Sequence, residues 1–174
     1  MEKTLKSDCL FQGNILTLVK DEVLLENGKI STREVVLHPG AVTIIPIFEN
    51  KIVFVEQYRY PVKERLLELP AGKLNKNEAP EVTAYRELIE ETGFIAKKLQ
   101  HLTTFYTTPG FSNEVMYLYL AEELQKTNPR PDEDEIVKTI FIEVDKIKEL
   151  LYSNQIKDAK TLIGLFWFLN FHDS

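Results

Sequence analysis

The order of the predicted secondary structure indicates an α+β domain. Strand-like segments fill most of the first sixty residues, one helix lies near the middle of the chain, and two helices follow at its end. Strands and helices do not alternate continuously, so a parallel doubly wound sheet is not expected. The chain has 174 residues, which is the length of about one domain with a substantial core.

The expected strands are short apolar or alternating segments bounded by turn residues. They are predicted at 15–25, 31–37, 41–48, 52–58, 102–106, 115–121 and 137–144. Asn27-Gly28 is a strong signal for a hairpin turn between the first two of these strands. Pro39-Gly40 separates them from the apolar strand that follows, so residues 1–40 are expected to form an N-terminal β segment and 41–174 the main domain.

Helices are indicated at three places. The central helix is predicted over about residues 78–92, with Pro80 in its first turn and Gly93 as its C-cap. A second helix is predicted at 145–153, and a third begins at a predicted N-cap, Asp158, and continues to residue 169.

The composition excludes several classes of protein. Hydrophobic residues make up 44% and charged residues 28%, which is typical of a globular protein. Acidic residues outnumber basic ones 27 to 21, for a formal charge of −6, and this argues against a nucleic-acid partner. An acidic protein also repels an anionic substrate unless a cation intervenes.

Neither end of the chain has the pattern of a targeting or membrane segment. The first eight residues lack the apolar core of a signal peptide, and the longest near-continuous apolar stretch, 162–169, is too short to span a membrane. The single cysteine, Cys9, cannot close an intrachain disulfide. We therefore expect a reducing, cytoplasmic compartment and no membrane partner.

The central helix has one apolar face and one acidic face. At about 100° per residue the packing face consists of Ala84, Tyr85, Leu88 and Ile89. The opposite face carries Glu87, Glu90 and Glu91, whose charges repel each other within one turn. A water-solvated surface is one explanation. The other is a bound Mg²⁺ or Mn²⁺ ion, which prefers oxygen ligands and turns the repulsion into coordination.

The wider spacing around this helix favours the metal site. From Gly72 the chain reads Gly72, five residues, Glu78, seven residues, and then Arg86-Glu87-Leu88-Ile89-Glu90-Glu91-Thr92-Gly93-Phe94. This pattern resembles the Nudix box at every specified position. The resemblance implies an α/β/α sandwich with a central mixed sheet, which refines the α+β prediction, and an N-terminal antiparallel β extension. It also implies hydrolysis of a nucleoside diphosphate linked to another moiety.

The resemblance assigns roles to the residues of the box. The metal ligands it implies are the backbone carbonyl of Ala71 and the carboxylates of Glu87, Glu90 and Glu91. Arg86 and Glu78 would form an internal ion pair, with Gly72 and Gly93 as turn residues. Two or more Mg²⁺ or Mn²⁺ ions would neutralise the pyrophosphate oxygens and acidify the attacking water. They would also offset the acidic charge that the substrate meets.

Segments outside the box are similar to ADP-ribose pyrophosphatases. Pro109 lies 16 residues after Gly93, within Thr107-Thr108-Pro109-Gly110-Phe111-Ser112-Asn113-Glu114. The segments 33–42, 56–60 and 68–72 also resemble that subfamily. The implied substrate contacts are Arg33, Glu34, Arg59, Thr108, Pro109, Gly110 and Glu114. An ordinary Pro-Gly turn and surface arginine–carboxylate pairs are the alternatives. Phe11 would be an aromatic platform for adenine or, alternatively, a core residue.

The catalytic base is expected on a loop as well as in the box. Pro131-Asp132-Glu133-Asp134-Glu135 is an acidic run before the strand at 137–144. Alone, such a run is typical of a solvated surface. The resemblance makes Glu133 the base and Glu135 an extra metal ligand, with roles that can be exchanged, and Glu90 a further catalytic carboxylate.

The function this implies is hydrolysis of ADP-ribose to AMP and ribose 5-phosphate. One alternative is a pyrophosphatase for another nucleoside diphosphate sugar such as GDP-mannose. Another is a non-catalytic Nudix domain that senses ADP-ribose, although the intact acidic set argues against it. The resemblance also implies a homodimer in which the arm 1–40 packs on the partner and reaches its substrate, with 41–174 as the Nudix hydrolase domain.

Overall fold

Two compact units make up the computed structural model, which describes residues 1–129 and 136–171. The first unit comprises Met1–Gly40 and Phe105–Val115, and the second comprises Ala41–Thr104 and Met116–Ser174. Each unit has its own sheet.

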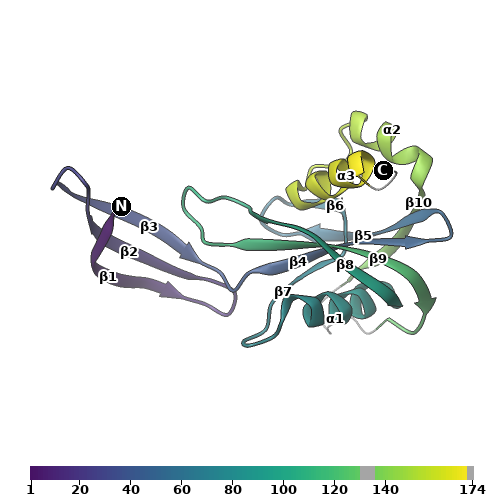
Figure 1. Ribbon diagram of the computed structural model, residues 1–174, viewed down its shortest axis with the longest axis horizontal. Coiled ribbons are helices and arrows are strands. Elements are labelled where there is room, and N and C mark those ends of the chain that lie inside the picture. Colours follow the sequence, from purple (N-terminus) through teal and green to yellow (C-terminus); the bar gives the residue numbers. More distant parts are fainter. Residues whose placement is uncertain (130–135, 172–174) are drawn as a thin grey trace. The chain divides into compact units, whose positions relative to one another are not determined.

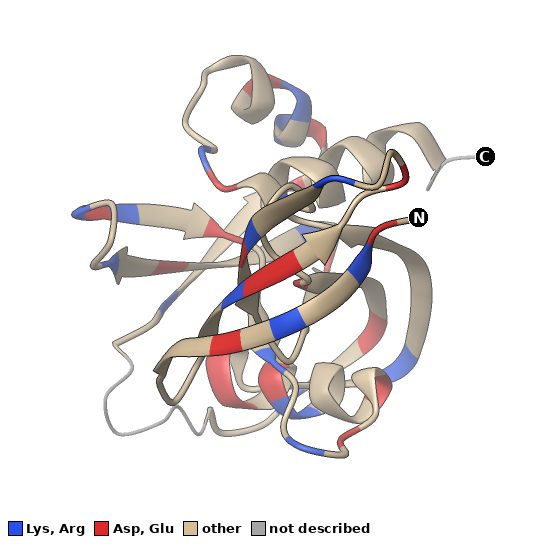
Figure 2. Cartoon of the chain, turned by 90° about the vertical axis from the view of Figure 1, so that its left-hand side faces the viewer, with Lys and Arg blue, Asp and Glu red and all other residues tan. Residues whose placement is uncertain are grey.

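The sheet of the first unit has three antiparallel strands. They are β1 (Lys3–Gln12), β2 (Thr17–Leu24) and β3 (Ile30–Leu37), paired in that order (Figure 1). The predicted hairpin turn is present, with Gly28 at a φ of 79° between β2 and β3. Lysine, arginine, aspartate and glutamate are interspersed along these strands (Figure 2). β1 lies within the expected N-terminal β segment 1–40, but no strand was predicted there, because it is exposed along its whole length and has no buried face to produce an alternating pattern.

The second unit contains a mixed sheet. Its strands are β4 (Ala41–Phe48), β5 (Lys51–Arg59), β6 (Glu64–Glu68), β7 (Ala71–Lys73), β8 (Phe94–Tyr106), β9 (Val115–Lys126) and β10 (Lys138–Glu143). The main order is β10-β5-β4-β9-β8, with β6 paired to β5 and β7 to β4. β4 runs parallel to β9 and antiparallel to β5 and β7, so the prediction of a mixed sheet is confirmed.

Helices cover both faces of this sheet. Helix α1 (Pro80–Thr92) packs on one face, and α3 (Ala159–Phe171) packs on the other together with α2 (Ile147–Tyr152), which follows the short 3₁₀ turn Val144–Lys146 (Figure 1). The α/β/α sandwich is therefore confirmed. No helix within residues 1–129 and 136–171 has both the length and the apolar character needed to cross a membrane.

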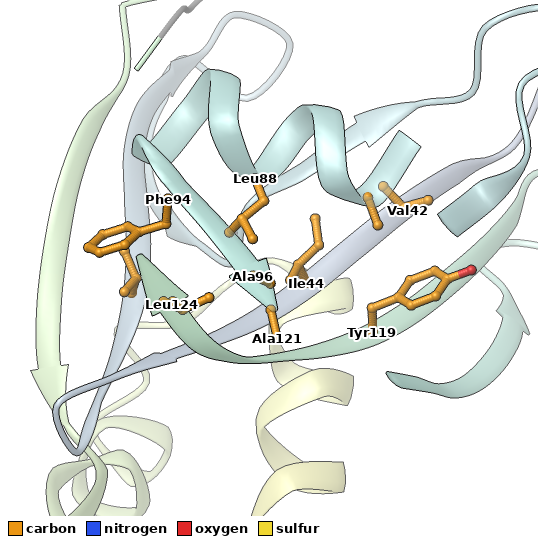
Figure 3. Close-up of a cluster of buried hydrophobic side chains, with 10 residues drawn as sticks. Val42, Ile44, Leu88, Phe94, Ala96, Tyr119, Ala121 and Leu124 are labelled. Carbon is orange, nitrogen blue, oxygen red and sulfur yellow. The ribbon is translucent and has the colours of Figure 1, made fainter. Parts of the chain in front are cut away.

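The core between α1 and the sheet is a cluster of buried apolar side chains (Figure 3). Leu88 of α1 meets Val42 and Ile44 of β4, and all three are inaccessible to solvent. Phe94, the first residue of β8, packs against Phe48 with ring centroids 4.8 Å apart. This core holds α1 against the sheet, and α1 carries Glu87, Glu90 and Glu91 of the box.

Several expectations for the strands and helices are wrong or incomplete. β8 begins at Phe94 rather than at residue 102, because Lys97, Lys98 and Gln100 make its first half look like a polar loop. The short strands β6 and β7 were not expected, since five- and three-residue strands around Pro70 leave little periodicity. The central helix starts at Pro80, two residues later than expected.

Candidate active site

Helix α1 is bounded by the two residues that the sequence indicates. Pro80 occupies its first turn, and Gly93 ends it in the left-handed conformation with a φ of 69°, donating its N–H to the Ile89 carbonyl at 2.9 Å. A Cβ at position 93 would lie 2.9 Å from both Pro129 Cδ and Thr127 O. Glycine is therefore required there both by the backbone and by close packing.

Two of the acidic residues on α1 are buried rather than solvated. Glu87 is 9% exposed and Glu91 is 5% exposed. The Ala71 N–H donates to Glu91 Oε2 at 2.9 Å. A Cβ on Gly72 would lie only 1.8 Å from Glu87 Cδ, so the missing side chain at Gly72 makes the space for that carboxyl group. Strand β7 thus holds both carboxylates beside the Ala71-Gly72 backbone.

Arg86 compensates the negative charge of this face. Its Nε and Nη2 donate to the two oxygens of Glu78 at 3.1 and 3.0 Å, which confirms the predicted internal ion pair. Its Nη1 also donates to Glu87 Oε1 at 2.6 Å and to Glu90 Oε2 at 2.8 Å. The Arg86 hydrogen bond lowers the pKa of Glu78 to about 2, while the carboxylates raise the pKa of Arg86.

The donor set fits a hard divalent cation. Glu87, Glu90 and Glu91 offer carboxylate oxygens, and the buried positions of two of them disfavour charge unless it is compensated. Across the described residues, no three histidine, cysteine or acidic side chains already converge as a preformed metal site. Glu87 and Glu90 are bound to Arg86 instead. Glu87, Glu90, Glu91 and the Ala71 carbonyl are the groups that could hold a metal ion.

Arg59 lies in the same unit, in a polar cluster that was not expected. Its Nε and Nη2 donate to the two oxygens of Glu68, each at 2.7 Å. Glu68 is 1% exposed and also binds Lys160, which contacts Asp158. The signal that could have revealed it is a charged residue that follows Leu66-Leu67 at the end of β6, directly before Leu69-Pro70.

The remaining substrate candidates lie in the first unit. The turn that contains Thr108, Pro109 and Gly110 is tied to β3, because the Val36 N–H donates to the Phe111 carbonyl at 2.8 Å. Glu114 accepts from the Thr107 hydroxyl at 2.6 Å and lies 3.4 Å from His38 Nδ1.

Strand β3 also carries Arg33 and Glu34. Arg33 is bound to Glu2 and to the Thr32 carbonyl, whereas Glu34 is exposed. Phe11 on β1 is 57% exposed, so it is not a core residue. Glu133 and Glu135 lie outside the described residues. The substrate candidates of the first unit thus lie on β3 and on the turn bonded to it. Arg59 and the box residues lie in the second unit.

Comparison with known proteins identifies the family. The NUDIX domain model matches residues 37–163. The chain belongs to the Nudix family. Residues 2–36 match a second model, the nucleoside diphosphate sugar hydrolase N-terminal domain. Within the Nudix family, which typically depends on divalent metal ions, this chain is a Nudix hydrolase with the full set of box residues.

Two curated Nudix relatives and one solved structure cover nearly the whole chain. An ADP-ribose pyrophosphatase of Bacillus subtilis (strain 168) is 45% identical over 94% of this chain and 90% of its own. A methanol dehydrogenase activator of Bacillus methanolicus is 46% identical with the same coverage. A crystal structure of an ADP compounds hydrolase superposes with a TM-score of 0.89 at 22% identity, over 99% of this chain and 94% of that one, and shares the fold.

Proposed function

We propose that this Nudix hydrolase converts ADP-ribose and water to AMP and ribose 5-phosphate, with Mg²⁺ as its metal. The observation that carries the proposal is the pair of buried box carboxylates, Glu87 and Glu91, held against the Ala71-Gly72 backbone. The choice of ADP-ribose as the substrate is supported by a relative named ADP-ribose pyrophosphatase, which is 45% identical over 94% of the chain.

The residues of the second unit divide the work of the reaction. Glu87, Glu91, Glu90 and the Ala71 carbonyl would hold the metal, which neutralises phosphate oxygens and acidifies water when it is bound. Arg86 orients Glu87 and Glu90 by donating to both carboxylates from one nitrogen. Hydrolysis adds the water oxygen to one phosphorus and breaks its bond to the bridging oxygen. A carboxylate takes the water's proton, and we assign this role to Glu133, with Glu135 and Glu90 as the other candidates.

We also propose which residues contact the substrate. Arg59 presents a guanidinium, whose planar fork suits phosphate oxygens. Arg33 and Glu34 on β3, and Thr108, Pro109, Gly110 and Glu114 on the adjacent turn, would contact the remainder of the dinucleotide. The charged and hydroxyl groups of this set are those that recognise ribose hydroxyls and phosphates.

A panel of nucleoside diphosphate sugars with Mg²⁺ tests the substrate. We expect the highest kcat/KM for ADP-ribose, with AMP and ribose 5-phosphate as products identified by mass spectrometry. A higher kcat/KM for GDP-mannose than for ADP-ribose would show that GDP-mannose is the preferred substrate. Binding of ADP-ribose without hydrolysis of any panel member would instead identify the chain as a sensor.

A glutamine substitution on α1 tests the metal assignment. Glu91→Gln keeps an oxygen that can accept the Ala71 N–H, so the fold should persist. Loss of a residue that only hydrogen-bonds to a metal ligand can lower activity by up to about 100-fold. Loss of the ligand itself should therefore lower the Mg²⁺-dependent kcat by more than about 100-fold. Glu81→Gln, at an exposed position of the same helix, is the matched control and should keep full activity. Wild-type turnover in Glu91→Gln would contradict the metal site.

The proposed assembly is a homodimer formed through the segment 1–40. Its support is strand β1, which is exposed along its length and presents Leu5, Leu10 and Phe11 at 46%, 56% and 57% exposure. Light scattering should give twice the chain mass of 20.2 kDa. Replacing Leu10 and Phe11 by serine should shift the protein towards monomer, and a wild-type monomer at assay concentration would refute the dimer.

A further inference from the structure

Glu68 is a buried carboxylate that holds one guanidinium in a fixed orientation. It ends strand β6, and both of its oxygens accept hydrogen bonds from Arg59, at 2.7 Å from Nε and 2.7 Å from Nη2. The Glu68 side chain is 1% exposed, whereas that of Arg59 is 38% exposed. This fork-to-fork pairing determines the plane of the guanidinium as well as its position.

Helix α3 supplies the charge that makes this burial possible. Lys160, whose side chain is 11% exposed, donates to Glu68 Oε2 and lies 2.9 Å from Asp158 Oδ2. Two cations and two anions therefore balance in the cluster. Burial acts to raise the pKa of Glu68, but the hydrogen bond from Arg59 and the charge of Lys160 outweigh it and hold that pKa below its usual range.

The same turn of α3 also fixes the backbone that leads from Glu68 to the metal-binding residues. The Thr161 hydroxyl accepts from the Leu69 N–H at 2.8 Å and donates to Asp158 Oδ2 at 2.6 Å. The Pro70 carbonyl accepts from the Ile44 N–H at 2.9 Å. Each residue from Glu68 to the metal-binding backbone thus has a fixed partner.

One box carboxylate, Glu91, interacts electrostatically with Arg59. The hydrogen bonds that Arg59 donates to Glu68 raise the pKa of Arg59, and the negative charge of Glu91 acts in the same direction. Two of the three guanidinium nitrogens of Arg59 donate to Glu68. The third, Arg59 Nη1, makes no hydrogen bond within residues 1–129 and 136–171. A guanidinium held through two of its nitrogens has the third available for an anionic oxygen.

We propose that Glu68, balanced by Lys160, is a positioning residue that holds Arg59 in the orientation in which it binds a phosphate group of the substrate. The proposal rests on the proposed function, because Arg59 is the group that touches substrate. The hydrogen bonds of the Glu68 carboxylate within residues 1–129 and 136–171 go to Arg59 and Lys160. A purely structural ion cluster would contribute to stability but would leave substrate binding by Arg59 unchanged.

Chemical rescue distinguishes these two roles. Arg59→Ala should raise KM for ADP-ribose by about tenfold or more, with a smaller change in kcat. Added guanidinium ion at millimolar concentration, against equal sodium chloride, should occupy the space beside Glu68 and recover several-fold of the lost kcat/KM. The double variant with Glu68→Gln should show no recovery, since a neutral amide does not hold the cation.

The matched control lies at the other end of the same strand. Glu64 begins β6 and pairs with Lys157, at half-exposed positions of both side chains. Glu64→Gln should leave KM unchanged and should not reduce the rescue of Arg59→Ala. If Glu68→Gln does not fold, Lys160→Met combined with Arg59→Ala decides the question, because it removes the balancing charge and should weaken rescue in the same direction.

Two results would overturn the proposal. One is equal guanidinium rescue with and without the change at Glu68 or Lys160. The other is a Glu68→Gln protein that melts at a lower temperature but keeps wild-type KM and kcat. Calorimetric binding of ADP-ribose in EDTA separates this proposal from the proposed function. Weaker binding in Glu68→Gln supports positioning even if no panel substrate is hydrolysed, and unchanged binding contradicts it.

Discussion

Gly72→Ala should inactivate the enzyme without unfolding it. The added Cβ would lie 1.9 Å from Glu87 Oε1 and 1.8 Å from its Cδ. Ordinary contacts begin at 3.4 Å, so the carboxyl group must retreat by roughly 1.5 Å. Gly72 does not have a positive φ, and the atoms it would strike are the end of a flexible side chain. The free energy of unfolding should therefore change by no more than about 1 kcal/mol.

The displaced carboxylate is one that we assign to the metal. A displacement of more than 1 Å in a catalytic group can cost about 100-fold in rate, so kcat should fall by about that factor. The Mg²⁺ concentration that gives half-maximal activity should rise in parallel. The assay is AMP release from ADP-ribose over a range of Mg²⁺ concentrations, with thermal unfolding of the same samples.

The control glycine for this experiment is Gly28, in the β2–β3 turn. A Cβ there meets nothing within 4 Å, and its φ of 79° is one that asparagine tolerates. Gly28→Asn should retain both stability and activity. If Gly72→Ala kept wild-type kcat with the same Mg²⁺ dependence, the position of Glu87 would not matter to the metal, and our assignment would be wrong.

Three further changes test the frame around the site. Glu78→Gln should lower stability at pH 7 by about 1–2 kcal/mol in urea unfolding. Because the pKa of Glu78 falls from 4.5 to about 2 on folding, its contribution is complete above pH 4.5 and is lost towards pH 2. The difference in the free energy of unfolding between the wild type and Glu78→Gln should thus disappear between pH 4.5 and pH 2. A difference that stays constant over this range would refute the Arg86 pairing. Leu88→Ala should cost about 2–5 kcal/mol through the cavity it leaves, and a loss under 1 kcal/mol would show that the core collapses around it. Gly93→Ala should cost about 1–3 kcal/mol, from its positive φ and the contact with Pro129, and a stabilised variant would contradict this close packing.

Local sequence signals predicted the parts of the site that depend on neighbours in the chain. The box spacing identified the family, and Pro80 and Gly93 marked the helix, because proline at a helix start and glycine at its end act through local backbone geometry. The ion pair of Glu78 and Arg86 was also expected, since both residues belong to one motif.

Contacts between distant segments could not be predicted in this way. Helical periodicity puts Glu87 and Glu91 on a polar face, but their burial depends on β7, which comes from outside the helix. Glu68 and Lys160 are separated by 92 positions in the chain. Nothing in the local pattern of either residue indicates the other, so this cluster appears only in the three-dimensional structure.

The contact between Thr161 and Leu69 has a consequence for the order of folding. It spans 92 positions, and closing such a long loop is entropically slow compared with forming α1 or a hairpin. The parallel pairing of β4 with β9 likewise waits for a strand that begins at Val115. A nascent chain that has not yet reached Asp158 would already contain the whole box, residues 72–94, while the backbone at Leu69 still lacks its partner. Chaperone contact or aggregation is expected mainly in that interval.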